Sequence, residues 1–126
     1  VGVGNVHAIA HQLGARYGIP HGQANALALP HVLKACLAEA ETALAELAVV
    51  TNVSDAASPA ARAQAFVEAV QDLIAKVGIA ETDPRIQPDD WTVLAHAAMD
   101  ESDGYVSPRL LTKAEIMDTL EQITAR

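Results

Sequence analysis

The sequence predicts an all-α fold, a bundle of five to seven helices. Of its 126 residues, 51% are hydrophobic but only 3% are aromatic, so a core must be built mainly from Ala, Leu, Val and Ile. Such residues suit closely packed helices better than a β-sandwich. Apolar residues also recur at helical spacing along several stretches, and we find no convincing strand. The length is that of one domain, residues 1–126, which is large enough to bury a core.

Two helical stretches are expected in the first fifty residues. The first spans about 3–17 and stops at Gly18, a residue that favours the left-handed end of a helix. The second begins near 20–22. We expect Pro30 to kink or restart it, because the proline ring removes an N–H donor and clashes with the preceding turn. The apolar pattern then resumes to about Val50.

Helix boundaries are marked more clearly in the rest of the chain. Ser58 and Pro59 are suited to be the N-cap and the first residue of a helix. Pro88 opens a further helix, and Thr112 with Glu115 forms a capping box for the last one. In the helix after Ser58, apolar residues repeat at helical spacing: Phe66, Val67, Val70, Leu73, Ile74 and Val77. The helix after Pro88 is expected to bury Trp91, Leu94, Ala95 and Ala98, and the apolar stripe of the last helix consists of Ile116, Leu120 and Ile123.

Charge and composition exclude several classes of partner. The chain has 8 Lys and Arg against 16 Asp and Glu, a net charge of −8, which suits neither nucleic acid nor an anionic membrane surface. The apolar runs are too short to span a bilayer, and no signal-peptide pattern is visible. Cys36 is the single cysteine, so no disulfide framework exists and we expect a reducing, cytoplasmic location.

Three of the five histidines, His7, His11 and His21, fall within fifteen residues. On a helix His7 and His11 share a face, and a turn over 18–20 can bring His21 back toward it. Imidazole is the commonest metal ligand in proteins, so this density predicts a metal site or its immediate surroundings. The alternative is a set of partly buried histidines bonded to backbone. Ala8 stands where a zinc peptidase carries its glutamate, which excludes that chemistry.

The sequence does not single out further metal ligands. A divalent ion needs four or more ligands or waters. The remaining candidates have no distinctive spacing, and a cap, a solvated face or a satisfied core group explains each of them better. These candidates are His31, His96, Asp89, Asp90, Asp100 and Asp103.

The stretch 6–32 resembles the histidine signature of the iron-containing (group III metal-dependent) alcohol dehydrogenases. It combines H-x-x-x-H, Gly14 three residues later, P-H-G, an A-N-A run at 24–26, and L-P-H-V. The segment 107–116 resembles the usual ending of that family more weakly, and 38–106 matches it only in helical character.

The resemblance implies an all-helical C-terminal domain that carries most of a metal site and follows an α/β domain that binds NAD or NADP. In that family one aspartate and three histidines hold the metal, Fe²⁺ or Zn²⁺ here. By motif position His7 and His21 correspond to two of these histidines. His11 corresponds to a non-ligand histidine near the nicotinamide and the substrate, with a catalytic part in proton transfer. The other two ligands and the nucleotide-binding domain are expected to be absent from this chain.

The implied parent activity is NAD(P)-dependent oxidation of a small alcohol or reduction of an aldehyde. The chain alone is expected to bind metal weakly and to be inactive or nearly so. The first helix begins almost at Val1 without a capping residue, so we expect a chain cut from a longer one or a truncated gene product.

Two alternatives remain open. The chain could be a stand-alone helical binding or assembly module that has lost catalysis and self-associates through the exposed face that would meet the nucleotide domain. A second copy or a partner chain could also supply the missing ligands.

Overall fold

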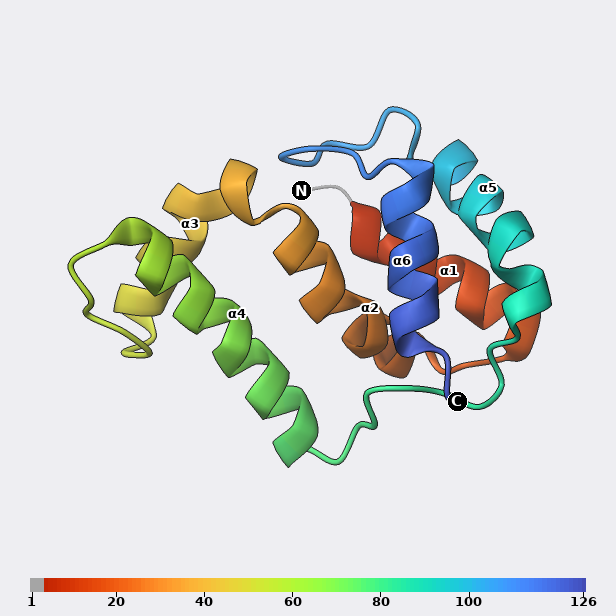
Figure 1. Ribbon diagram of the computed structural model, residues 1–126, viewed down its shortest axis with the longest axis horizontal. Coiled ribbons are helices and arrows are strands. Elements are labelled where there is room, and N and C mark those ends of the chain that lie inside the picture. The colour runs from red at the N-terminus through yellow and green to blue at the C-terminus, as the bar shows by residue number, and fades with distance from the viewer. Residues whose placement is uncertain (1–3) are drawn as a thin grey trace.

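The computed structural model describes residues 4–126 as a set of packed helices (Figure 1). The α-helices are α1 (Asn5–Tyr17), α2 (His21–Ala35), α3 (Leu37–Val50), α4 (Pro59–Lys76), α5 (Trp91–Ser102) and α6 (Lys113–Ile123), with a 3₁₀ turn, η1 (Pro88–Asp90), before α5. Strand pairing in this range is limited to an isolated parallel bridge between Asp83 and Thr124. The all-α prediction is confirmed. The expected helix start at Val3 lies outside the described residues.

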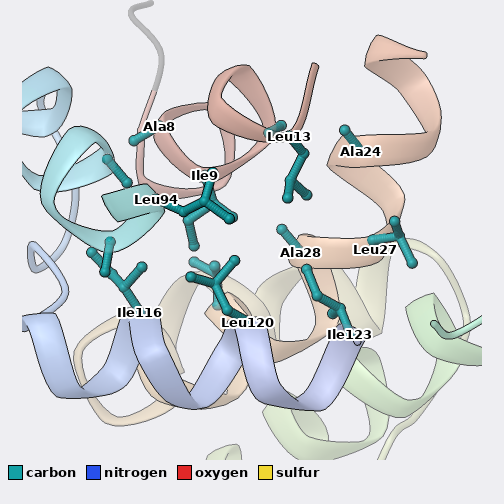
Figure 2. Packing of buried hydrophobic residues seen from close by; sticks show 14 of the residues in the cluster. Ala8, Ile9, Leu13, Ala24, Leu27, Ala28, Leu94, Ile116, Leu120 and Ile123 are labelled. Carbon is teal, nitrogen blue, oxygen red and sulfur yellow. The ribbon is translucent and has the colours of Figure 1, made fainter. Parts of the chain in front are cut away.

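The larger hydrophobic cluster, called the main cluster below, lies between α1, α2, α5 and α6 (Figure 2). Ile116, Leu120 and Ile123 of α6 point toward Ile9 and Leu13 of α1. Complete burial of side chains of this size stabilises a fold by about 1.5 to 3 kcal/mol each. The main cluster comprises Ala8, Ile9, Ala10, Leu13, Ile19, Ala24, Leu27, Ala28, Val32, Cys36, Ile86, Leu94, Ala95, Ala98, Leu111, Ile116, Leu120 and Ile123.

Helices α3 and α4 form a hairpin on the other side of α2 (Figure 1). Its own buried cluster consists of Leu44, Ala45, Ala63 and Val67. The apolar residues of α4 are only partly covered: Leu73 is 60% exposed and Val77, at its C-cap, is 63% exposed. The residues packed against α4 within 4–126 cover its apolar stripe mainly around Val67.

Most of the expected helix ends are confirmed. The Ser58 hydroxyl accepts a hydrogen bond from the Ala61 N–H at 3.4 Å, and Thr112 and Glu115 form a complete capping box. Gly18 adopts the left-handed conformation, φ 68°, at the end of α1. These local signals act within one turn of chain, so they do not depend on tertiary packing.

Pro30 was expected to kink or restart the helix; the restart is wrong, and the kink stays a prediction. Helix α2 continues through Pro30 to Ala35, and the interruption comes at Cys36. Leu27 and Val32 flank the proline and are buried in the main cluster. Because helices in proteins are stabilised mainly by packing, this burial offsets the hydrogen bond that the proline removes.

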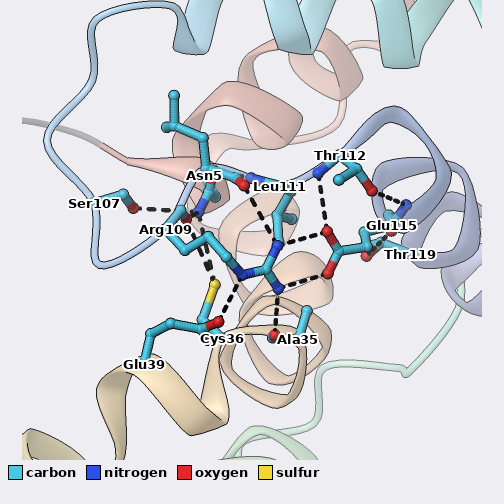
Figure 3. Close-up of polar contacts among 11 residues, drawn as sticks. Asn5, Ala35, Cys36, Glu39, Ser107, Arg109, Leu111, Thr112, Glu115 and Thr119 are labelled. Atoms are coloured by element: carbon cyan, nitrogen blue, oxygen red, sulfur yellow. Dashed lines mark hydrogen bonds and ion pairs between the residues drawn. The ribbon is translucent and has the colours of Figure 1, made fainter.

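A polar network fixes the loop between α5 and α6 against the start of α1 (Figure 3). The buried Asn5 side chain donates to the Arg109 carbonyl at 2.7 Å and accepts from the Leu111 N–H at 3.2 Å. The Arg109 guanidinium pairs with both Glu115 oxygens at 2.7 Å and donates to the Ala35 carbonyl at the end of α2. Arg109 holds the pKa of Glu115 at about 2, and Glu115 raises the pKa of Arg109. The loop therefore closes one end of the main cluster.

The connection between α4 and α5 is fixed against the C-terminal end of α6. The Asp83 N–H donates to the Ile123 carbonyl at 2.9 Å, and the Asp83 carboxylate pairs with Arg85, which lowers the pKa of Asp83. The Trp91 indole N–H donates to the Thr124 hydroxyl at 2.9 Å. No helix in residues 4–126 has both the length and the apolar character needed to cross a bilayer.

Candidate metal centre

The turn between α1 and α2 brings the imidazoles of His7, His11 and His21 together. His7 and His11 lie one turn apart on α1, and the chain reverses through Gly18 and Pro20 so that α2 begins at His21. The ring centroids are 5.6 Å apart for His7 and His11, 5.3 Å for His7 and His21, and 5.6 Å for His11 and His21. The three rings thus lie close together, while their roles as ligands or catalytic groups remain predictions.

The spacing of His7 and His21 suits two imidazoles on a common ion. Two ring nitrogens bound at about 2.1 Å to a tetrahedral ion hold their ring centroids roughly 5 to 5.5 Å apart. Neutral imidazole suits both Fe²⁺ and Zn²⁺. Within residues 4–126, however, no group of three or more His, Cys, Asp or Glu side chains has the arrangement of a metal site. The ring spacing of His7 and His21 is the observation that favours a shared ion.

Asn25, one turn after His21 on α2, is a polar neighbour of the histidines that the sequence did not single out. Its amide nitrogen lies 3.0 Å from His21 Nε2 and donates to the His21 carbonyl at 3.0 Å. Its side-chain oxygen is buried and has no hydrogen-bond partner within the described chain. In the sequence, the position of Asn25 four residues after His21, within the A-N-A run, is the feature that indicates this contact.

Glu101 on α5 is a second neighbour that the sequence did not reveal. One of its carboxylate oxygens lies 2.8 Å from His11 Nδ1 and 3.1 Å from the Tyr105 hydroxyl. The other accepts from the Gln12 amide at 3.3 Å. Ninety residues separate Glu101 from His11 in the sequence, so no local pattern indicates this contact.

The other ligand candidates are placed differently. Asp90 accepts hydrogen bonds from Arg16 and from the Tyr17 hydroxyl, and the Arg16 contact lowers the pKa of Asp90. His31 lines a separate pocket between α2, α4 and α6, where burial lowers its pKa. The remaining four candidates are exposed: Asp89, His96, Asp100 and Asp103.

An apolar pocket of about 570 Å³ opens beside His7. Leu29, Leu33 and Ile74 contribute to its wall, and His7 and Asn25 are among its polar residues. Sites for small molecules are typically apolar cavities with a few polar groups that orient the ligand. The pocket can therefore accept a small, mainly apolar ligand next to His7.

Known sequences resemble this chain over nearly its whole length. The profile described as "Fe-containing alcohol dehydrogenase family, C-terminal" matches residues 1–124. The 1,3-propanediol dehydrogenase of Citrobacter freundii is 32% identical over 123 residues, which are 95% of this chain and 32% of that protein. The lactaldehyde reductase of Escherichia coli K12 is 37% identical over 121 residues, 94% of this chain and 32% of that protein.

Solved structures show the same relationship. A crystal structure of 1,3-propanediol oxidoreductase matches with a TM-score of 0.89 at 31% identity, over 96% of this chain and 32% of that one. The alcohol dehydrogenase from Oenococcus oeni matches with a TM-score of 0.88 at 32% identity, over 98% of this chain and 33% of that one. The chain spans about a third of the length of these relatives. It belongs to the iron-containing alcohol dehydrogenase family and corresponds to the C-terminal region of those enzymes.

Proposed function

We propose that this chain supplies the helical, metal-binding part of an NAD(P)-dependent alcohol dehydrogenase or aldehyde reductase. The observation that carries the proposal is the 5.3 Å approach of the His7 and His21 rings at the turn between α1 and α2. His7 and His21 would hold Fe²⁺ or Zn²⁺. When bound, such an ion supplies Lewis-acid polarisation of an alcohol or carbonyl oxygen.

The other residues around the histidines have roles that follow from their chemistry. His11 accepts the proton of the alcohol hydroxyl in oxidation and returns it in reduction. The apolar pocket beside His7 binds the carbon chain of the substrate and excludes water from it. The relatives named for 1,3-propanediol and lactaldehyde favour a small alcohol or aldehyde as the substrate.

The donor set and the cofactor site are completed from outside these 126 residues. Two imidazoles fill half of a four-coordinate site. In this proposal the remaining ligands and the NAD(P) site belong to the part that corresponds to the other two thirds of the relatives. The chain alone then binds metal weakly and turns over no substrate.

Calorimetric titration of the chain with Zn²⁺, or with Fe²⁺ under anaerobic conditions, tests the ligand assignment. We expect one weak site, and both His7→Ala and His21→Ala should weaken it by at least about tenfold, because each removes one of two protein donors. His96→Ala, an exposed histidine on α5, is the matched control. Unchanged binding by the His7→Ala/His21→Ala double variant would contradict the assignment. Robust NAD(P)H turnover by the chain alone would contradict the proposed inactivity.

A helical assembly module is the second candidate, and the exposed apolar residues of the hairpin favour it. Val49, Val50, Leu73 and Val77 are all at least half exposed. Val49 and Val50 lie beside the start of α4 and Leu73 and Val77 at its end, so apolar side chains are exposed at both ends of the hairpin. Exposed apolar side chains are typical of interaction surfaces, so we propose self-association through the hairpin. Sedimentation should show a dimer that Leu73→Gln weakens, and one metal ion per dimer if two copies share ligands. A monomer at all concentrations, with and without Zn²⁺, would contradict it.

The cytoplasmic location remains a prediction from the lone Cys36.

A further inference from the structure

The Glu101 carboxylate is held by side chains of α1 and of the segment after α5. The Tyr105 hydroxyl contacts one oxygen at 3.1 Å, and the Gln12 amide of α1 contacts the other at 3.3 Å. His11 Nδ1 lies 2.8 Å from the oxygen that Tyr105 also contacts. The Glu101 side chain is 29% exposed and that of His11 is 38% exposed. A carboxylate with both oxygens engaged in this way cannot turn away from His11 without losing several bonds at once.

An ionised carboxylate only accepts hydrogen bonds, so the nitrogen opposite it must carry a proton. At 2.8 Å, His11 Nδ1 is therefore the donor to Glu101. A neutral imidazole has one N–H, and the proton on Nδ1 leaves Nε2 as an acceptor. Asn25 beside His21 has no comparable influence, because an amide can present either an N–H or an oxygen to a ring.

We propose that Glu101 is a positioning residue that fixes neutral His11 as the Nδ1–H tautomer and keeps Nε2 free to accept a proton from the substrate hydroxyl. The inference deepens the function proposed above and rests on it for the part about substrate. With the proton on Nε2 instead, that nitrogen could only donate, and His11 could not take up the hydroxyl proton through it during alcohol oxidation. Tyr105 and Gln12 support the effect by holding the carboxylate in place.

Nitrogen-15 NMR of the histidine side chains in the metal-free chain tests this inference directly. Spectra are recorded at a pH where the imidazoles are neutral, and His11→Gln assigns the signals of His11. In the wild type, His11 should show Nδ1 as protonated and Nε2 as unprotonated. Glu101→Ala should lower the ratio of Nδ1–H to Nε2–H by at least about tenfold, as expected for loss of a charge-assisted hydrogen bond.

Two further variants separate positioning from a general structural effect. Asp100→Ala removes a carboxylate of the same charge from the preceding, exposed position and should leave the His11 tautomer unchanged. Tyr105→Phe removes one donor to the carboxylate and should shift the ratio in the same direction as Glu101→Ala, but less.

A wild-type His11 with its proton on Nε2 would overturn the inference. This measurement does not depend on whether any variant folds. Retention of the Nδ1–H tautomer in folded Glu101→Ala would overturn it as well. If Glu101→Ala does not fold, the wild-type spectrum and Tyr105→Phe decide. Because the measurement contains no metal, its outcome is independent of the titration that tests His7 and His21 as ligands.

Discussion

The main cluster and the α3–α4 hairpin differ in how they are stabilised, and the histidine site depends on the first. Helices α1 and α2 bury Ile9, Leu13 and Leu27 in the main cluster, while His7 and His21 project from the same two helices. The hairpin has a small cluster of its own and leaves much of its apolar surface exposed. This difference indicates that the positions of the His7 and His21 rings are set by the residues of α1 and α2 that are buried in the main cluster. The hairpin contributes little to these positions.

The largest expected effect comes from the same substitution in the two regions. Leu13→Ala should lower the free energy of unfolding by about 4 kcal/mol, because Leu13 is completely buried among α1, α2 and α6. Leu44→Ala in the hairpin should cost only about 2 kcal/mol, because a small, partly open cluster can close around the missing atoms. Urea unfolding followed by circular dichroism measures both values. Equal losses, or a larger loss for Leu44→Ala, would break the comparison.

A smaller effect is expected for the buried amide that fixes the loop before α6. Asn5→Ala leaves the Arg109 carbonyl and the Leu111 N–H without their partner, which should cost about 2 kcal/mol. Gln64→Ala removes an exposed amide that contacts Glu68 on the hairpin, and it should change stability by less than about 0.5 kcal/mol. The same urea experiment compares them, and a cost for Gln64→Ala that matches Asn5→Ala would argue against the assigned role of Asn5.

The smallest effect is a pH dependence from Glu115. Its pKa in the folded chain is about 2, against an ordinary value of 4.5, so the folded state favours the ionised form. The stabilisation is complete above about pH 5 and is lost as the pH falls toward 2. Since the side chain is partly exposed, we expect about 1 to 2 kcal/mol rather than the full value of the shift.

Glu115→Gln should therefore be less stable than the wild type at pH 7 and nearly equal to it at pH 2.5. Glu68→Gln on the exposed face of α4 should run parallel to the wild type at both values. Urea midpoints measured across this range give the comparison. A difference between Glu115→Gln and the wild type that stays constant with pH would show that the ion pair with Arg109 is not its source.

The features that the sequence predicted well are those that depend on near neighbours in the chain. The cap at Ser58 and the capping box at Thr112 act within one turn, and the approach of His7 and His21 needs only a helix face and one reversal. What could not be predicted depends on distant partners. Glu101 reaches His11 across ninety positions, and Arg109 reaches Ala35 across more than seventy.

Two features that the sequence does not indicate have the same origin. The pattern of α4 shows which side is apolar but not whether another element covers it, so it does not reveal that Leu73 and Val77 are exposed. Pro30 weakens a helix locally, but it does not reveal how firmly the residues around it are packed. In both cases the outcome is decided by tertiary contacts that periodicity does not encode.

Trp91 gives the two regions different optical signatures. It is the single tryptophan of the sequence, and its indole is packed against the main cluster and bonded to Thr124, while the hairpin contains none. The fluorescence of Trp91 therefore reports on the contact between the start of α5 and the end of α6. Far-ultraviolet circular dichroism instead averages over every helix. If α3 and α4 melt before the rest, ellipticity will fall while the emission maximum stays in place, and the gap between the two curves will measure how independently the hairpin behaves.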